Sequence, residues 1–515
     1  MGSIVETSYG TLAGFEHNGI HTFRGIPFAQ PPVGALRFRA PRPPARWAGT
    51  REASQFAPAA PQNHSPLGPM LGFDIGSTDE DCLYLNVWTP GCDGARRPVM
   101  VWIHGGAFVM GAGSQTLYNG ETLARRGDVV VVTINYRLGM FGFLRLQEIY
   151  GDALPATGNE GLLDQVAALE WVRNEIASFG GDPNNVTVFG ESAGSISVAT
   201  LLGTPRARGL FQRAILQSGA ANFVSPRAQG ARVADAVLRD LNLTGAHPEK
   251  LLEVPTAQLL ETQQRAYMSL QGKLRGLVFA PVADGDVLPR HPLEAIGDGA
   301  ARDVTLLVGS NLDEMTLFGL MDPQARSLDE AGLLRRCERI IPVPDAAGHA
   351  RRAVDTYRRV RRERSEGVTP SELWFAIDSD RAFRYPTMRL AELQQAHQPR
   401  TFAYLFTWPS PFMGGTLGAC HALELPFVFG KLDDPVLKNF VGNGPAARRL
   451  GEDIQEAWLA FAHSGNPAHA GLGDWPTYDA KRRTTMLLGA ECTLEHAPRE
   501  GERAFWEFWN GTLSS

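Results

Sequence analysis

The chain has 515 residues, of which 43% are hydrophobic and 20% charged, a composition typical of a globular protein with a large core. Its net charge is −6, so no basic surplus indicates binding to nucleic acid or to an anionic membrane. No stretch approaches the roughly 18 uncharged apolar residues of a membrane span, and the first residues lack the pattern of a secretion signal. We therefore expect a cytoplasmic protein.

The first 50 residues or so differ from the rest of the chain. A hairpin-like start is followed by the proline-rich segment "PFAQPPVGALRFRAPRPPARW" at 27–47. Proline fixes its own backbone and disfavours a helix in the residue before it, so this segment is expected to be extended or turning.

Several later segments are nearly continuous apolar runs, as expected for strands buried on both faces of a parallel sheet. They lie at 99–105, 129–136, 186–190, 214–219, 304–311 and 402–408. Between the second and third runs, residues 162–180 have apolar residues at helical spacing. This alternation predicts a doubly wound, mostly parallel α/β sheet with helices on both faces. Residues at about 312–395 read as a helical insertion, so we expect one domain over 1–515.

The run at 186–190 leads into Gly190-Glu191-Ser192-Ala193-Gly194, which fits the pattern G-x-S-x-G between a strand and a helix. This pattern forms a sharp turn that holds a serine in a strained conformation above the sheet, with glycines leaving space on both sides. A capping serine in an ordinary glycine-rich turn is the alternative. The strand and helix around the pattern favour Ser192 as a nucleophile.

A serine hydroxyl needs a base to take its proton and an acid to orient that base, in the chain order serine, acid, histidine. His421 follows a strand of the same predicted sheet, where a loop could bring it over Ser192. Asp313 and Glu314 directly follow the strand at 304–311, and spacing alone does not choose between them. His104 precedes the serine, so we expect a structural role for it.

The glycine-containing loop "WIHGGAF" at 102–108 follows another strand. Such a loop can turn backbone amides toward a developing oxyanion, together with the amide of Ala193, the residue after the nucleophile. A simple turn is the alternative. The G-x-S-x-G motif later in the chain favours the oxyanion loop over it.

Taken together, these residues resemble the type-B carboxylesterase family, which includes cholinesterases and bacterial para-nitrobenzyl esterases. The segment "FGGDPNNVTVFGESAG" at 179–194 fits the family's active-site signature, and "EDCLYLNVWTP" at 80–90 fits its second signature. The closing segment "FAHSGNPAHAGLGDWPTY" at 461–478 is similar as well, so the resemblance spans nearly the whole chain. It implies the α/β-hydrolase fold.

The resemblance also implies roles for individual residues. The family motif G-x-N-x-D-E makes Glu314 the acid of the triad with Ser192 and His421, and leaves Asp313 a structural role. The oxyanion donors correspond to the amides of Gly106, Ala107 and Ala193, and Ser218 is a candidate for support of the triad. Candidate substrate-pocket residues are Phe108, Leu277 and Phe279.

Two ion pairs follow from the same resemblance: Arg37 with Glu80, and Arg137 with Asp164. Secreted relatives pair the cysteine that corresponds to Cys82 with one upstream, but the upstream loop here contains none. Cys82 should therefore be free, and five cysteines in so long a chain favour a reducing compartment. The same loop lacks a tryptophan for a quaternary ammonium, which makes choline esters poor candidates.

We therefore expect a serine carboxylesterase that hydrolyses small-molecule esters through an acyl-enzyme, without cofactor or metal. The alternatives are a hydrolase of carbamates, amides, lactones or polyesters by the same mechanism, and a non-catalytic binding member of the family. The complete triad argues against the last. The sequence leaves the oligomeric state open, with a monomer as the default expectation.

Overall fold

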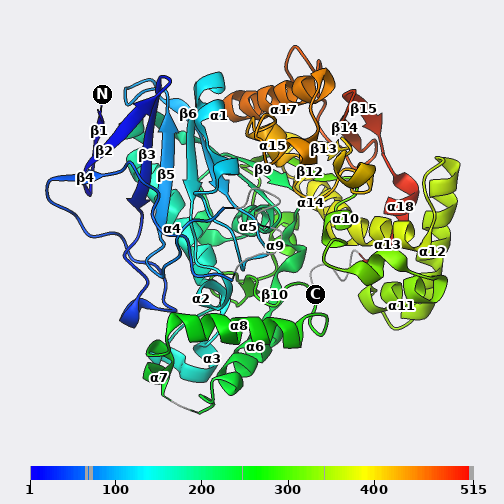
Figure 1. Cartoon of the computed structure of the whole chain (residues 1–515), viewed down its shortest axis with the longest axis horizontal. Helices are drawn as coiled ribbons and strands as arrows, with labels where there is room; N and C mark the ends of the chain where they lie inside the picture. The colour runs from blue at the N-terminus through cyan, green and yellow to red at the C-terminus, as the bar shows by residue number, and fades with distance from the viewer. Residues whose placement is uncertain (1, 64–67, 69–73, 246, 342, 510–515) are drawn as a thin grey trace.

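A sheet of thirteen strands runs through the part of the chain that the computed structural model describes, which is residues 2–63, 68, 74–245, 247–341 and 343–509 (Figure 1). Its strands are β1 (Gly2–Thr7), β2 (Gly10–His17), β3 (Ile20–Pro27), β4 (Thr50–Glu52), β5 (Tyr84–Thr89), β6 (Arg97–Ile103), β7 (Val130–Ile134), β8 (Gly181–Glu191), β9 (Arg213–Gln217), β12 (Thr305–Asn311), β13 (Thr401–Phe406), β14 (Thr484–Leu488) and β15 (Thr493–His496). A separate pair consists of β10 (Ser225–Pro226) and β11 (Val282–Ala283).

Seven neighbouring strands in the middle of the sheet are parallel, in the order β7, β6, β8, β9, β12, β13 and β14. They include all six apolar runs identified in the sequence. The antiparallel strands β1, β2, β3 and β5 extend one side, and the first three form the meander expected from the hairpin-like start. From β6 the chain moves first to β7 and later to β8 on the opposite side, so the strand order reverses between β6 and β8. In open α/β sheets, ligands bind at the carboxyl ends of the strands at this reversal.

Helices cover both faces of the sheet. Successive side chains of a strand point to opposite faces, so each central strand contributes to two hydrophobic cores. In β6, Val99 and Val101 belong to the larger hydrophobic core, together with residues of α4 (Glu160–Glu175) and α5 (Ala193–Leu202). Met100 and Trp102 belong to the second core, with α17 (Pro445–Ser464). Both faces of the central strands are therefore dry, which explains their continuous apolar sequences.

The remaining helices follow or separate these strands, and five of them lie between β12 and β13. They are α1 (Glu121–Gly127), α2 (Gly139–Phe143), α3 (Gln147–Tyr150), α6 (Arg227–Asp240), α7 (Pro248–Leu252), α8 (Thr256–Leu270), α9 (Pro292–Gly297), α10 (Met315–Phe318), α11 (Glu330–Ile340), α12 (Ala346–Glu363), α13 (Pro370–Ser379), α14 (Tyr385–Gln395), α15 (Leu425–Val428), α16 (Lys438–Val441) and α18 (Glu500–Phe505).

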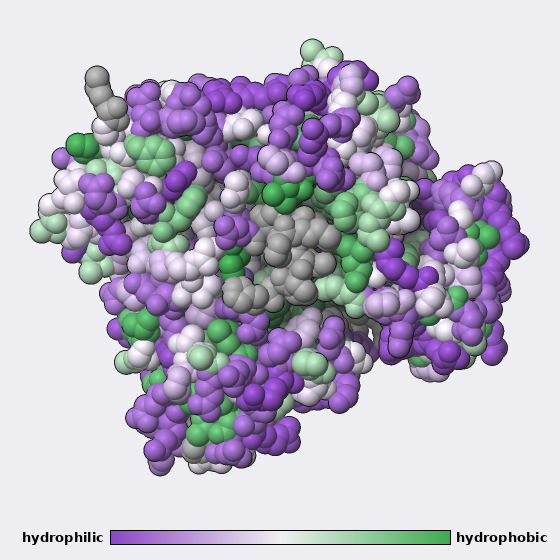
Figure 2. Space-filling model, in the orientation of Figure 1, coloured by the Kyte–Doolittle hydropathy of each residue, from purple (hydrophilic) through white to green (hydrophobic). Residues whose placement is uncertain are grey.

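The helices α11, α12 and α13 pack on one another and stand out at one side of the sheet (Figure 1). In Figure 2, mostly hydrophilic residues cover this lobe, whereas apolar residues gather near the centre of the same face of the molecule. None of the helices in the described ranges is both long and apolar enough to span a membrane.

Both ion pairs implied by the resemblance are present. Arg37 lies 2.6 Å from Glu80, and Arg137 lies 2.7 Å from Asp164, measured between nitrogen and oxygen. Cys82 is buried and free, as expected, and the other four cysteines are free as well.

Breaking the Arg137–Asp164 pair is expected to destabilise the fold strongly. The guanidinium donates two hydrogen bonds to the carboxylate, and the side chains are 3% and 0% exposed. Arg137→Met leaves a buried carboxylate without its partner, so we expect the free energy of unfolding to fall by about 3–5 kcal/mol. Urea denaturation measures this change.

The matched control is Arg448→Met, because Arg448 makes the same kind of pair with Asp433 at the surface, where the side chains are 59% and 75% exposed. Its loss is expected to change the free energy by at most about 1 kcal/mol. Equal effects of the two substitutions would show that burial does not decide the contribution of these pairs.

Candidate active site

Ser192 occupies a sharp turn between β8 and α5, with φ = 56° and ψ = −123°. A positive φ is strained for a residue other than glycine, and such strain gathers at functional sites. The glycines of the motif have a specific task here. A Cβ atom added to Gly190 or Gly194 would lie 2.7 Å or 2.0 Å from the carbonyl oxygen of Ile103, so both allow the turn to pack against the end of β6.

Glu314 and His421 meet at the ends of the neighbouring parallel strands β12 and β13. His421 Nδ1 lies 2.6 Å from Glu314 Oε2, and Glu314 Oε1 accepts a hydrogen bond of 2.7 Å from the amide of Asn311. Both side chains are buried. The carboxylate is therefore fixed, and it can hold the imidazole with Nε2 directed away from it.

His421 Nε2 lies 3.0 Å from Glu191 Oε1, the carboxylate of the residue before Ser192. The hydroxyl of Ser192 makes no hydrogen bond to any residue that the structure describes. Catalytic hydrogen bonds are often loose without substrate and tighten only in its complex. The structure thus brings Glu314 and His421 into contact and places His421 beside the serine turn.

Carboxylates surround His421 and change its acidity. Burial lowers the pKa of His421, but the negative charges of Glu191, Glu314 and Glu424 together outweigh burial and raise the pKa above the usual histidine value. Burial also raises the pKa of the Glu191 carboxyl, and His421 opposes this shift. The two groups lie 3.0 Å apart, so the protonation of each depends on that of the other.

Glu424 lies deeper than His421 and belongs to a buried polar network. Its carboxylate accepts hydrogen bonds from Gln217 Nε2 at 3.0 Å and from Asn311 Nδ2 at 2.7 Å, and Gln217 accepts one from Trp458. Sequence reasoning missed both Glu191 and Glu424. In the sequence, Glu191 is marked only by its place at the variable position before the serine of G-x-S-x-G, and Glu424 only as an acid three residues after His421.

The loop after β6 passes directly beside the serine. A Cβ atom added to Gly105 would lie 3.1 Å from Ser192 Cβ. The next three residues, Gly106, Ala107 and Phe108, all have positive φ, at 111°, 52° and 60°. No described residue accepts a hydrogen bond from the amides of Gly106, Ala107 or Ala193, so these donors are available for an anion.

His104, at the start of this loop, is part of the framework. Its ring stacks on Tyr136 with centroids 4.5 Å apart, and Nδ1 lies 2.8 Å from the carbonyl oxygen of Gly105. Burial lowers the pKa of His104 to about 4, so the ring is neutral at neutral pH. These contacts agree with the structural role expected from its place before the serine.

Ser218 follows β9, next to the serine turn. Its amide donates a hydrogen bond of 2.9 Å to Gly309, and its φ is 55°. The Ser218 hydroxyl is buried and has no partner among the described residues. The neighbouring Gly219 packs on Ser192, whose carbonyl oxygen would lie 2.7 Å from an added Cβ atom.

The three candidate pocket residues differ in exposure. Phe108 and Phe279 are fully buried in the larger core, whereas Leu277 is half-buried. Two other aromatic residues contact the candidate base: the rings of Phe318 and Phe383 lie 5.1 Å and 4.8 Å from that of His421.

Phe383 reaches this position from a turn of π-helix at Asp380–Arg384, between α13 and α14. Turns of this kind are frequent at functional sites, and periodicity in the sequence does not reveal them.

A strained serine at the reversal of a parallel sheet, a histidine with a buried acid, and a loop of free amides define the α/β-hydrolase class. The chain belongs to the carboxylesterase family, whose model matches residues 2–506. It is therefore a carboxylic ester hydrolase with small-molecule ester substrates.

The chain is similar to the para-nitrobenzyl esterase of Bacillus subtilis (strain 168), at 40% identity over 97% of each chain. It is 37% identical to a phenmedipham hydrolase of Pseudarthrobacter oxydans over 95% of each chain. Among solved structures, a Geobacillus stearothermophilus carboxylesterase matches with a TM-score of 0.86 and 41% identity, over 98% of this chain and all of the other.

Proposed function

We propose that Ser192, His421 and Glu314 form the catalytic triad of a two-step ester hydrolysis. Ser192 Oγ attacks the ester carbonyl while His421 Nε2 takes its proton, and Glu314 holds the imidazole and stabilises its cation. His421 then gives the proton to the leaving alcohol, which leaves an acyl-enzyme. In the second step His421 activates water, which releases the acid and restores Ser192.

The amides of Gly106, Ala107 and Ala193 are proposed to bind the oxyanion in both steps. The support is their freedom from described acceptors and the passage of the loop beside Ser192. Donors that are already oriented stabilise the developing charge without reorganisation, and loss of one typically lowers kcat by about a hundredfold to a thousandfold.

One observation above all supports this triad: the buried Glu314 carboxylate lies 2.6 Å from His421, whose other ring nitrogen lies 3.0 Å from Glu191, the residue before a serine held at positive φ. Hydrogen-bonded in this way, Nδ1 carries the proton of the neutral imidazole, and Nε2 is left as the base.

We propose that the substrates are esters with an apolar or aromatic group next to the reacting carbonyl. Phe318 and Phe383 support this, because they present rings at the imidazole where a bound ester must lie. The name of one relative, a para-nitrobenzyl esterase, agrees with an aromatic group in the substrate. The pocket residues Phe108, Leu277 and Phe279 remain candidates.

The test is a panel of nitrophenyl esters of graded acyl length, with aryl carbamates and amides, followed by labelling with an organophosphate. We expect the highest kcat/KM on esters and a single adduct, which peptide mass spectrometry places on Ser192. An adduct on any other residue would contradict the proposed nucleophile. Faster turnover of carbamates or amides would keep the mechanism and change the substrate class.

The pH dependence of kcat/KM should reflect the carboxylates around His421. A protonated imidazole cannot accept the serine proton, so activity falls as pH falls through the histidine pKa. Because that pKa is raised, the midpoint of the fall is expected above the ordinary value of about 6.5. Glu191→Gln removes the strongest of the charges that raise it, so the midpoint should move to lower pH.

The control for this experiment is Glu456→Gln, since the Glu456 side chain is 45% exposed and pairs with Arg126. Profiles of kcat/KM against pH for the three proteins decide the question. An unchanged midpoint in Glu191→Gln would show that the neighbouring carboxylate does not control His421.

We also propose that the protein works in the reducing cytoplasm. The support is the five free cysteines, three of them buried and none paired in the described chain. Thiol titration of the protein denatured without reductant is expected to find five thiols per chain, and a lower number would indicate oxidation in the cell. Cell fractionation then gives the location directly.

A further inference from the structure

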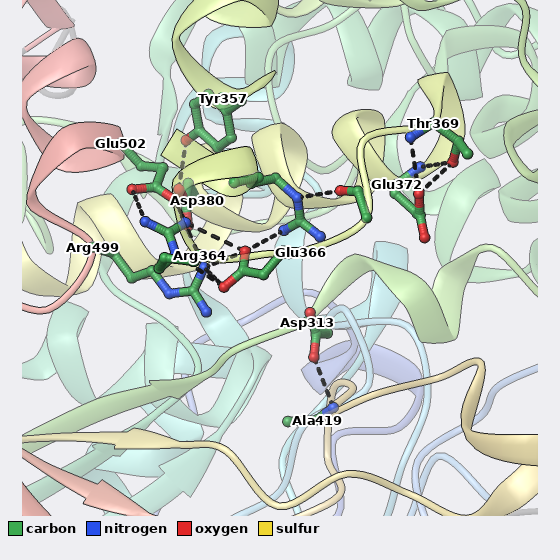
Figure 3. Close-up of polar contacts among 12 residues, drawn as sticks. Asp313, Tyr357, Arg364, Glu366, Thr369, Glu372, Asp380, Ala419, Arg499 and Glu502 are labelled. Atoms are coloured by element: carbon green, nitrogen blue, oxygen red, sulfur yellow. Dashed lines mark hydrogen bonds and ion pairs between the residues drawn. The ribbon is translucent and has the colours of Figure 1, made fainter. Parts of the chain in front are cut away.

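The loops that carry the proposed triad acid and base are joined by a pair of reciprocal hydrogen bonds. The amide of Asp313 donates to the carbonyl oxygen of Ala419 at 2.9 Å. The amide of Ala419 donates back to Asp313 Oδ2, also at 2.9 Å (Figure 3). Asp313 precedes Glu314, and Ala419 lies two residues before His421. The Asp313 carboxylate therefore closes a ring of two hydrogen bonds beside the contact between Glu314 and His421.

Two further hydrogen bonds between the same two loops run from side chains to backbone carbonyl oxygens. Asn311 Nδ2 donates to the carbonyl oxygen of Cys420 at 2.8 Å, and Thr316 Oγ1 donates to that of Leu417 at 2.5 Å. Together with the bond at Ala419, they hold the backbone before His421 at Leu417, Ala419 and Cys420. At Ala419 a side chain accepts from the backbone amide, and the Ala419 residue is 1% exposed.

Gly418 shows how closely the carboxylate fits this loop. A Cβ atom added to Gly418 would lie 2.3 Å from Asp313 Oδ2, and the residue has φ = 55°. Any side chain at 418 would push the carboxylate away from the amide of Ala419. Gly418 therefore leaves the space in which the Asp313 carboxylate accepts the amide of Ala419.

We propose that Asp313 is a positioning residue for catalysis: by accepting the amide of Ala419 it fixes the His421 loop against the Glu314 loop and sets the imidazole in place. This rests on the proposed triad. A displacement of about 1 Å in a catalytic group can lower the rate about a hundredfold, so a hydrogen bond without contact to substrate can matter for turnover.

The surroundings of Asp313 explain why an acceptor is needed more than a charge. Burial raises the pKa of the Asp313 carboxyl, and the hydrogen bond from Ala419 and the positive charges of Arg361 and Arg499 oppose this shift. Arg361 forms an ion pair with Glu366 at 3.3 Å, and Arg499 forms one with the same carboxylate at 2.8 Å. Because both arginines already pair with Glu366, they depend little on the charge of Asp313. A neutral side chain at 313 that can accept the amide of Ala419 is therefore expected to hold the loop almost as well.

The test compares Asp313→Ala with Asp313→Asn. The alanine variant leaves the buried amide of Ala419 unpaired, and we expect kcat to fall about tenfold to a hundredfold with KM changed no more than about twofold. The asparagine variant keeps an acceptor oxygen, and we expect it to retain kcat within about threefold of the parent. A purely structural role would lower stability and leave kcat per folded molecule unchanged.

The matched control is Asp329→Ala, because the Asp329 carboxylate accepts the same kind of hydrogen bond, from the amide of Gly332 at 2.6 Å, at the start of α11. It should leave kcat unchanged. In addition, the proton between His421 Nδ1 and Glu314 should give a low-field NMR signal that weakens or shifts in Asp313→Ala and not in Asp329→Ala.

Gly418→Ala tests the arrangement independently, should Asp313→Ala fold poorly. It is expected to lower kcat in the parent and to have a smaller effect combined with Asp313→Ala, because that substitution removes the carboxylate that the added Cβ atom would meet. Equal effects in the parent and in Asp313→Ala would overturn the proposal. So would a parental kcat in Asp313→Ala, or equal losses in the alanine and asparagine variants.

These outcomes are separate from failure of the triad. If the organophosphate labels a residue other than Ser192, the proposed function is wrong whatever Asp313 does. If Ser192 is labelled and Asp313→Ala turns over normally, only the positioning role is wrong.

Discussion

Ser192→Ala is expected to lower kcat for ester hydrolysis by about a millionfold, which is the loss measured when such a nucleophile is removed from a comparable triad. Alanine keeps the backbone and Cβ of the turn, so the fold should be unaffected. Only the hydroxyl that is proposed to form the acyl-enzyme is lost. The experiment compares kcat on a nitrophenyl ester and the urea midpoint of unfolding for both proteins.

Ser197→Ala is the matched control. Ser197 is a buried serine five residues further along α5, and its hydroxyl accepts a hydrogen bond of 2.9 Å from Gln165. This variant should lose some stability and keep kcat. Hydrolysis retained by Ser192→Ala would exclude Ser192 as nucleophile, while the labelling experiment would show which residue replaces it.

Glu314→Gln is expected to lower kcat by about ten thousandfold at neutral pH, as the same change does in a related triad. The amide that replaces Oε2 can donate to Nδ1 and so favours the wrong tautomer, with the proton on Nε2. It also gives no charge to stabilise the imidazolium. The loss should appear in kcat at saturating substrate, measured with the ester that wild type hydrolyses fastest.

Asp313→Asn makes the same chemical change one residue earlier and is the natural comparison. We expect it to stay within about threefold of wild type, because its oxygen can still accept the amide of Ala419. If Asp313→Asn lost activity by orders of magnitude and Glu314→Gln did not, the roles of the two acids would be reversed.

The sequence predicted the α/β sheet and its parallel centre well. Strands buried on both faces have continuous apolar sequences, and the apolar runs at 99–105 and 304–311 are β6 (Arg97–Ile103) and β12 (Thr305–Asn311). The ion pair between Arg137 and Asp164 was also predicted, although only through the family resemblance.

The local reasoning about the serine turn did not identify which backbone its glycines admit. We expected Gly190 and Gly194 to let neighbouring backbone pass, and the structure shows that this backbone is the end of β6 at Ile103 and, for Gly190, also Gly194 across the turn. Which backbone approaches a glycine depends on strand order. That order follows from the whole sheet and not from the five residues of the motif.

The acidic surroundings of His421 could not be predicted. Glu191 stands at a position that the motif leaves free, and Glu424 comes from a later turn of chain whose place depends on α15. Spacing could not separate Asp313 from Glu314 because adjacent residues at a strand end reach the same loop. Here both do contact the His421 loop, one through the imidazole and one through a backbone amide.

The positive φ of Ser192 sets the stability of the fold against its activity. A non-glycine residue held at φ = 56° stores on the order of 1–3 kcal/mol of conformational energy in the folded state. Glycine would relax this strain, yet it would remove the hydroxyl. Selection for ester hydrolysis therefore opposes selection for stability at this single position. A strained residue persists where the surrounding structure fixes it, and here the turn packs against the end of β6 at Ile103.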